Sequence, residues 1–216
     1  MTRTRLALLL LLAAPMVGCE QSSAVPNSPK PAPAAEVSPR ITVHKVVAAE
    51  PVEPTIPPVW LSRMHANWCV SKVGEPFPTT ELPSLGGALT KLSTLYGKQA
   101  AVVLFWTSDR WMSRMALEDL VHGVVAVYAP EQVAVVGIAV GQSTGAARKL
   151  LGEAKAEFPQ LLDADGSALA DVGSVALPRL YVLDPAGKIV WFDIEYSEST
   201  RRELEQTLSV LTAAGE

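Results

Sequence analysis

The segment from Ala100 to Arg114 constrains the fold of this chain more than any other. Residues 100–106 form an unbroken apolar run (AAVVLFW), a short polar stretch follows, and apolar residues then recur at helical spacing. This pattern predicts a buried strand that leads directly into a helix. In an open α/β sheet, such a turn lies where the free N–H groups of the helix face the ligand-binding crevice. We therefore expect the functional site at this turn.

The rest of the sequence continues the alternation of strands and helices. Residues 133–140 (VAVVGIAV) are typical of a strand buried on both faces, and two more strands flank a turn at 184–187. We expect helices over 110–128, 145–156 and 167–172, and a last one from about Thr200. Ser108 or Asp109 is the expected N-cap of the first of these helices. The alternation predicts an α/β domain.

The first 58 residues do not have the composition of a folded domain. In residues 1–19, two arginines precede an apolar run that is too short to span a bilayer, which is typical of an export signal. The end of this segment, MVGC, resembles a bacterial lipobox, in which Cys19 becomes the lipidated first residue. An ordinary cleaved signal with an incidental cysteine is the alternative. Residues 20–58 are rich in proline and alanine, which favours an extended tether. We expect an envelope protein anchored to membrane lipid through Cys19.

Charge and cysteine content narrow the range of partners and cofactors. The formal net charge is −4 and no basic run is present, so nucleic acid is not an expected partner. With Cys19 lipidated, Cys69 is the only thiol left, and no intramolecular disulfide can form. The three histidines lack zinc spacing, and Asp163 and Asp165 beside a glycine resemble a turn more than a calcium loop. We expect no metal and no cofactor. The oligomeric state stays open.

Residues 59–72 are expected to form a short amphipathic helix that packs on the domain. Trp60, Met64 and Trp68 recur at helical spacing after two prolines. His65 and Cys69 are also four residues apart, so they share one helix face. Two interpretations stay open for Cys69. It is either a thiol activated by a neighbouring imidazole or, more simply, a small side chain that fills a gap beside a tryptophan.

Three blocks of the sequence resemble thioredoxin-fold redoxins and membrane-anchored thiol–disulfide reductases. At the predicted turn, Phe105, Trp106 and Arg114 match the active-site pattern F-W-A-x-W-C-x-x-C-R of that superfamily. Residues 73–98 resemble the segment before its first core strand, and residues 175–191 resemble its ending. The resemblance implies a thioredoxin-like domain over 73–216, with three layers, a central mixed β-sheet and flanking helices. It also implies that Pro178 is a cis-proline opposite the turn.

The two cysteine positions of that pattern carry Arg110 and Ser113 in this chain. The superfamily's chemistry needs a thiolate at the helix N-terminus and a second cysteine to resolve the mixed disulfide. A guanidinium and an unassisted hydroxyl do neither. The chemistry of peroxiredoxins, which share this fold, needs a cysteine on the same turn. Residues 107–113 contain no cysteine. Dithiol exchange at this turn is therefore excluded by residue type.

Three functional hypotheses remain. The first is a redox-inactive module that binds an anionic group of a protein or peptide partner in the former active-site groove, lined by Arg110, Trp111, Ser113, Pro178 and Arg179. A local ion pair of Asp109 with one of these arginines, without any ligand, is the simpler alternative. The second hypothesis is thiol-dependent oxidoreductase or peroxidase-like activity through Cys69.

The third hypothesis is a serine hydrolase. Residues 141–145 (GQSTG) fit the pattern G-x-S-x-G with Ser143 as the nucleophile, between a predicted strand and a predicted helix. All three histidines precede Ser143. The α/β-hydrolase fold, to which this pattern belongs, places its histidine after the serine. A serine that caps the following helix is the alternative explanation of this motif.

Overall fold

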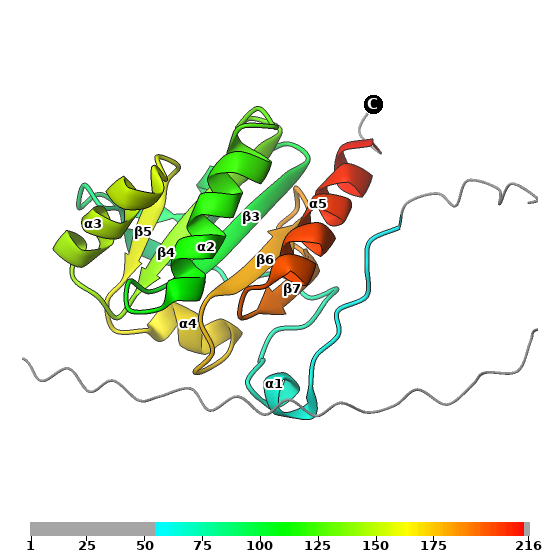
Figure 1. Cartoon of the computed structure of the whole chain (residues 1–216), viewed down its shortest axis with the longest axis horizontal. Helices are drawn as coiled ribbons and strands as arrows, with labels where there is room; N and C mark the ends of the chain where they lie inside the picture. Colours follow the sequence, from blue (N-terminus) through cyan, green and yellow to red (C-terminus); the bar gives the residue numbers. More distant parts are fainter. Residues whose placement is uncertain (1–54, 214–216) are drawn as a thin grey trace, which may run out of the picture. The chain divides into compact units, whose positions relative to one another are not determined.

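The computed structural model describes residues 55–213 (Figure 1). The predicted export signal, Cys19 and most of the predicted tether lie outside the described residues. None of the helices within 55–213 has the length and apolar character needed to cross a membrane.

A five-stranded mixed sheet forms the centre of the domain, with the strand order β5-β4-β3-β6-β7. Strands β3 (Ala100–Trp106), β4 (Val133–Val140) and β5 (Gln160–Asp163) run parallel to one another. Strands β6 (Arg179–Leu183) and β7 (Ile189–Ile194) complete the sheet as antiparallel neighbours. A separate small hairpin joins β1 (Glu81–Pro83) to β2 (Leu89–Lys91).

Helices cover both faces of this sheet. Helices α2 (Trp111–Leu120), α3 (Thr144–Ala154) and α5 (Glu198–Ala213) supply buried side chains to one core cluster, on the face that also carries Trp106. Helix α4 (Ser167–Val172) and the 3-10 turn η1 (Leu92–Leu95) supply the cluster on the opposite face. Figure 1 shows α2 and α5 in front of the sheet. The predicted three-layer, thioredoxin-like α/β architecture is confirmed.

The predicted helix over 59–72 is wrong in its extent. Helix α1 spans only Arg63–Asn67, capped by Ser62, and none of its residues is buried. Trp60 is 81% exposed and Met64 is 57% exposed, while Trp68 packs against the core. The chain leaves the helix at Trp68 because Cys69 next pairs with Gly173 in a β-bridge.

Two other helix boundaries differ from the prediction. The helix after the turn ends its regular part at Leu120 and continues as a π-helical segment, η2 (Val121–Val125). Helix α5 begins at Glu198 rather than at Thr200, because Ser197 and Thr200 exchange hydrogen bonds at its start.

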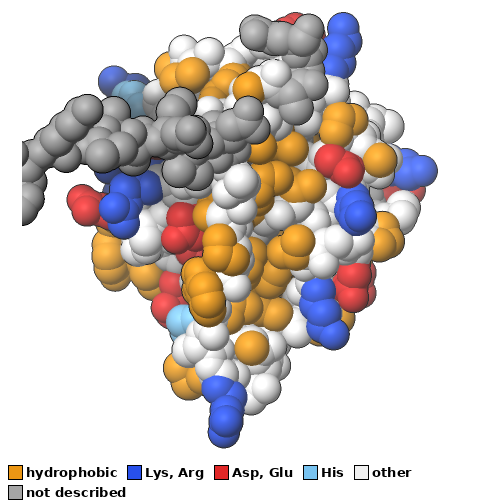
Figure 2. Space-filling view, turned by 90° about the vertical axis from the view of Figure 1, so that its right-hand side faces the viewer, with side chains coloured by type: hydrophobic (Ala, Val, Ile, Leu, Met, Phe, Trp, Pro, Cys, Tyr) orange, Lys and Arg blue, Asp and Glu red, His pale blue; other side chains and the backbone are white. Residues whose placement is uncertain are grey.

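The last residues of the predicted tether contact the domain. Ile56 packs against the core, and Gln206 of α5 donates from Nε2 to the carbonyl oxygen of Thr55 at 2.7 Å. Together with residues 74–77, which hydrogen-bond to the backbone around β7, this segment covers one edge of the sheet. Figure 2, which views the molecule from that side, shows a band of hydrophobic side chains. Covering an edge strand in this way protects it from pairing with other chains.

A buried hydrogen bond explains why residue 137, in the centre of β4, is glycine. The indole Nε1 of Trp106 donates to Oε1 of Gln160 at 3.0 Å. A Cβ atom at Gly137 would lie 2.1 Å from that same oxygen, far inside contact distance.

We expect Gly137→Ala to lower the free energy of unfolding by about 2–3 kcal/mol, the usual effect of overpacking a core. Gln160→Ala in the same chain should recover part of this loss, because it removes the atom with which the new methyl collides. Urea unfolding of the two single variants and the double variant measures the coupling.

Gly152→Ala is the matched control, since no atom lies within 4 Å of its added Cβ. For Gly152→Ala we expect the free energy of unfolding to stay the same or to rise by up to about 1 kcal/mol, because alanine is the better helix former. Equal effects at positions 137 and 152 would contradict the proposed collision.

Candidate functional site

The turn between β3 and α2 is held in place from the neighbouring strand. Gln142, in the loop after β4, accepts from the N–H of Ser108 at 2.9 Å and donates to the carbonyl oxygen of Trp106 at 3.4 Å. Because β3 and β4 are parallel, their carboxyl ends meet at one edge of the sheet. This role of Gln142 was not predicted from the sequence. The available signal was a polar residue two positions after the end of the adjacent buried strand.

Ser113 fills one of the two thiol positions and has an internal structural role. Its side chain is fully buried, and its Oγ accepts from the backbone N–H of Thr107 at 3.2 Å. This bond closes the turn onto the first turn of α2. Ser113 therefore does not face a ligand, although the sequence analysis placed it in the groove.

Arg110 fills the other thiol position and is exposed to solvent. It is the N-cap of α2, and no side chain caps the helix, so the predicted capping by Ser108 or Asp109 is wrong. Trp111, the first residue of the helix, is 67% exposed. We call Arg110, Trp111 and this uncapped helix start the turn surface. It combines a cation, an indole and helix N–H groups that favour negative charge.

The peptide bond between Leu177 and Pro178 is cis, as the resemblance implied. Pro178 is buried, and its carbonyl oxygen accepts from the N–H of Glu195 at 2.8 Å. The strand β6 begins directly after it, with Arg179 opposite Phe105 of β3. Pro178 thus fixes the start of β6 beside the end of β3.

Arg179 does not belong to the turn surface, and its predicted place in a groove with Arg110 is wrong. Its side chain is fully buried, in the layer that contains Phe105 and Tyr181. Helix α2 packs on the opposite face of the sheet. Alternate residues of a strand point to opposite faces, so the residue after the cis-proline is directed away from α2.

The guanidinium of Arg179 contacts four residues, which come from the segment 68–69, the loop before β6 and β6 itself. Nη2 donates to the carbonyl oxygens of Trp68 at 2.7 Å and Ser174 at 2.6 Å. Nη1 lies 3.5 Å from both the Sγ of Cys69 and the hydroxyl of Tyr181, and Nε has no hydrogen-bond partner. No carboxylate within residues 55–213 forms an ion pair with it. A buried, unpaired charge of this kind is costly in an apolar interior.

Tyr181 does not neutralise this charge. Burial raises the pKa of its phenol to about 12, an effect that the nearby guanidinium only partly offsets. The hydroxyl is therefore neutral at physiological pH.

Cys69 is half-buried and has a different neighbour from the one predicted. Its thiol donates to the backbone carbonyl oxygen of His65 at 3.3 Å. The imidazole of His65 instead stacks on Trp68 and lies 3.8 Å from the carboxylate of Glu195. The charged group in contact with the sulfur is Arg179, from a strand 110 residues later in the sequence.

Ser143 is a helix cap. Its Oγ accepts from the N–H of Ala146 at 3.2 Å, and no histidine side chain bonds to it among the described hydrogen bonds. The hydrolase hypothesis therefore has no geometric support. Asp163 likewise accepts from the N–H groups of Ala168 and Leu169 at the start of α4.

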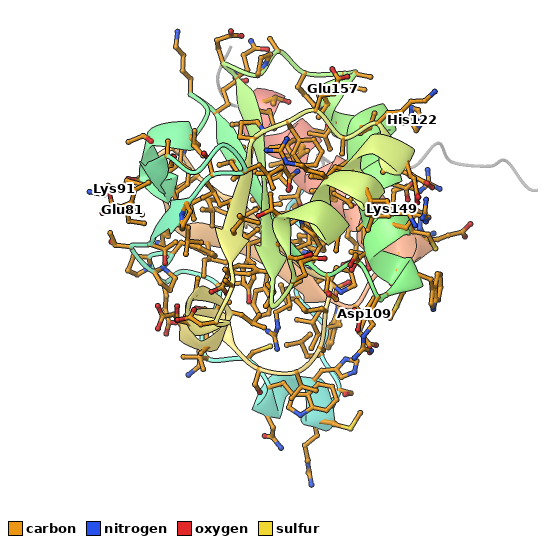
Figure 3. All side chains as sticks on the ribbon, turned by 90° about the vertical axis from the view of Figure 1, so that its left-hand side faces the viewer. Glu81, Lys91, Asp109, His122, Lys149 and Glu157 are labelled. Atoms are coloured by element: carbon orange, nitrogen blue, oxygen red, sulfur yellow. The ribbon has the colours of Figure 1, made fainter. Side chains whose placement is uncertain are left out.

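Within residues 55–213 no group of three or more metal-ligating side chains is found. In Figure 3 the labelled side chains, including Glu81, Asp109, His122 and Glu157, are spread around the molecule rather than gathered.

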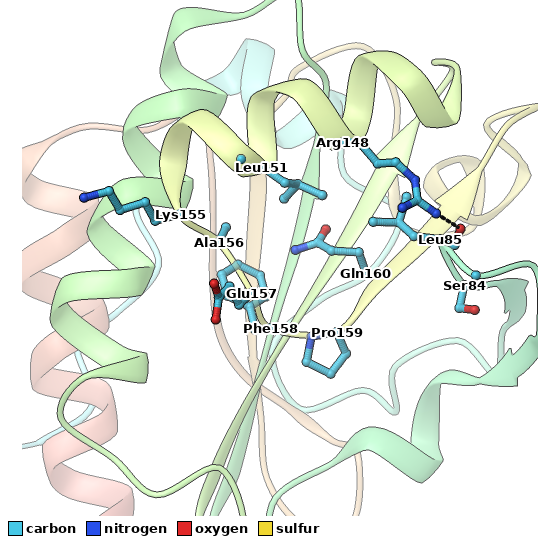
Figure 4. A pocket seen from close by; sticks show the side chains of 12 residues that line it. Ser84, Leu85, Arg148, Leu151, Lys155, Ala156, Glu157, Phe158, Pro159 and Gln160 are labelled. Carbon is cyan, nitrogen blue, oxygen red and sulfur yellow. Dashed lines mark hydrogen bonds between the residues drawn. The ribbon is translucent and has the colours of Figure 1, made fainter.

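A pocket of about 670 Å³ lies beside β5 and away from the turn (Figure 4). Its lining includes Leu85, Arg148, Phe158 and Gln160, and no residue of the turn surface contributes. Arg148 crosses its rim and donates to the carbonyl oxygen of Leu85 at 2.8 Å. The pocket is therefore a separate feature from the turn.

Comparison with known proteins agrees with this geometry. The sequence matches the AhpC/TSA family over residues 73–192, more than half of the chain. The chain belongs to the AhpC/TSA family. A curated relative, the thiol:disulfide interchange protein DsbE of Pseudomonas aeruginosa, is 33% identical over 122 residues, which cover 54% of this chain and 63% of the relative. This AhpC/TSA chain thus spans less than two thirds of that relative's length.

Solved structures share the fold of this AhpC/TSA domain. A candidate protein disulfide isomerase from Bacteroides thetaiotaomicron gives a TM-score of 0.63 at 20% identity, covering 68% of this chain and 94% of that one. A secreted Mycobacterium tuberculosis disulfide oxidoreductase, homologous to E. coli DsbE, gives a TM-score of 0.52 at 24% identity. The match covers 61% of this chain and 96% of that one. These likenesses establish the thioredoxin-like fold.

We expect Ser113→Ala to lower the free energy of unfolding by about 1–2 kcal/mol, because the N–H of Thr107 loses its acceptor in a partly buried turn. Urea unfolding checks this. Ser108→Ala is the matched control, since Ser108 is exposed and its backbone, not its side chain, bonds to Gln142. A change at Ser113 as small as at Ser108 would show that the hydroxyl is not needed to close the turn.

Proposed function

We propose that this AhpC/TSA member is a binding module of the bacterial envelope that is redox-inactive at its turn. In this proposal the turn surface binds an acidic group of a protein or peptide partner, and a lipid on Cys19 anchors the chain. The observation that carries the proposal is the state of the two thiol positions. Ser113 is buried and bonded within the turn, while Arg110 is exposed at the helix start.

This arrangement supports the proposed loss of dithiol exchange at the turn. Thiol–disulfide exchange needs a sulfur that an incoming disulfide can reach in line. Position 110 carries a permanent cation, and position 113 carries a hydroxyl with no access to solvent. The strand, the turn and the cis-proline that position such a site are all in place.

An acidic group fits the turn surface for three reasons. A guanidinium binds a carboxylate through two parallel hydrogen bonds, and an exposed indole adds a flat apolar contact. The uncapped start of α2 adds the positive end of a ten-residue helix. The described ion pairs do not include Arg110, so the proposed internal pair with Asp109 does not occupy it.

Export and lipid anchoring rest on the sequence of residues 1–19. A relative of the same fold is described as secreted, which agrees with an envelope location. Replacing Cys19 by alanine should release the chain from the membrane fraction of the cells that make it.

Activity assays test the loss of redox function. We expect the wild-type chain to leave insulin disulfides intact in the presence of a dithiol reductant. The double variant Arg110→Cys, Ser113→Cys restores the spacing C-x-x-C on the retained framework, and we expect it to gain insulin reduction. Reduction of insulin by the wild type at a comparable rate would overturn the proposal.

Peptide titration tests the binding role. We expect a peptide with one glutamate to shift the NMR signals of the turn, and a peptide with glutamine in its place to bind at least tenfold more weakly. Arg110→Ala should remove the difference between the peptides, since the charge-assisted bond is worth about 1.5–3 kcal/mol. Arg202→Ala, at an exposed position of α5, is the control for net charge. If Arg110→Ala and the wild type discriminate equally between the two peptides, the turn surface is excluded as the binding site.

A further inference from the structure

We propose that Cys69 is a thiol-modification site in which the buried guanidinium of Arg179 promotes exchange with an incoming disulfide. The product is a mixed disulfide on Cys69. This site uses neither Arg110 nor Ser113, and it lies in the layer of the domain opposite α2.

Arg179 carries a charge that no described ion pair balances. Its side chain is fully buried, no carboxylate of the described chain pairs with it, and its Nε is without a partner. Neutral carbonyl oxygens accept from Nη2, and a neutral phenol lies beside Nη1. The remaining contact of Nη1 is the sulfur of Cys69, the one thiol in residues 55–213, on a half-buried residue.

The guanidinium of Arg179 has a fixed direction. The bonds from Nη2 to Trp68 and Ser174 hold the planar group so that Nη1 points to the sulfur, at 3.5 Å. Residue 173 is glycine because a Cβ there would lie 2.3 Å from the Trp68 oxygen and 2.5 Å from Nη1. The local backbone is thus shaped around the guanidinium.

The surroundings of Cys69 are partly open to solvent. Cys69 is half-buried rather than enclosed. The next residue, Val70, is 62% exposed. Val175, which is 67% exposed, follows the Gly173–Ser174 segment that binds the Cys69 backbone and Arg179. Exposed apolar side chains therefore flank the half-buried Cys69, and we expect an incoming disulfide to approach the sulfur from this side.

The exchange balances without a further reagent. The thiol of Cys69, which donates to the carbonyl oxygen of His65 in the resting state, gives its proton to solvent. The sulfur anion attacks one sulfur of the incoming disulfide and forms a new S–S bond, while the old S–S bond breaks. The electron pair of that bond leaves with the second sulfur, which takes up a proton as a free thiol. Arg179 stabilises the negative charge on the attacking sulfur.

The experiment follows the reaction of Cys69 with 2-hydroxyethyl disulfide, a neutral probe that the guanidinium does not attract through charge. The full chain carries Cys19→Ser, so that Cys69 is its only thiol, and peptide mass spectrometry measures the adduct with time at pH 7. We expect the folded chain to react faster than the same chain unfolded in urea. An equal or slower rate in the folded chain overturns the proposal.

Variants separate charge from packing. We expect Arg179→Met to slow the reaction by about tenfold, the effect of one charge-assisted hydrogen bond, and Arg179→Lys to keep part of the rate. Tyr181→Phe removes a hydroxyl that contacts the same Nη1 but leaves the charge, and we expect the wild-type rate. If Arg179→Met does not fold, two measurements test the proposal in its place. They are the reaction rate of Arg179→Lys and the ratio of the rates of the folded and the unfolded chain. A slower rate in Tyr181→Phe that matches Arg179→Lys assigns the effect to packing and overturns the proposal.

Discussion

The burial of β3 on both faces is the constraint on which the rest of the structure depends. Its alternate residues belong to two separate core clusters, and it pairs with β4 on one side and β6 on the other. Each face must be covered, which requires the three layers. The strand can end only where a polar turn reaches solvent, and this places the turn of residues 107–110 at the edge of the sheet. The position of the candidate site is thus a consequence of core formation.

The same alternation divides the chemistry of that edge into two surfaces. Arg179 lies opposite Phe105 and shares its layer, whereas α2 and Arg110 cover the other layer. A single residue step along β6 would have placed the guanidinium on the side of α2. The pairing of β6 with β3 therefore sets which side chains of β6 face each layer.

The turn between β3 and α2 contains no cysteine, and its stability does not depend on one. Gln142 and Ser113 hold the backbone of the turn through hydrogen bonds, and Trp106 is anchored to Gln160. A thiol pair would contribute reactivity at this place rather than packing. Membership of the AhpC/TSA family and a turn without cysteines are therefore compatible.

The sequence alone determined the strands, the order of the elements and the absence of thiols from the turn. Strands β3 and β4 and helix α4 occupy the predicted residues, because an unbroken apolar run or a helical period reports burial directly. The tertiary structure decided where side chains with more than one suitable environment go. Trp60 and Met64 share a helical period with Trp68, yet only Trp68 meets the core. Arg179 became a buried partner of Trp68 and Cys69, which lie about 110 positions earlier in the chain, so no local pattern can report these contacts.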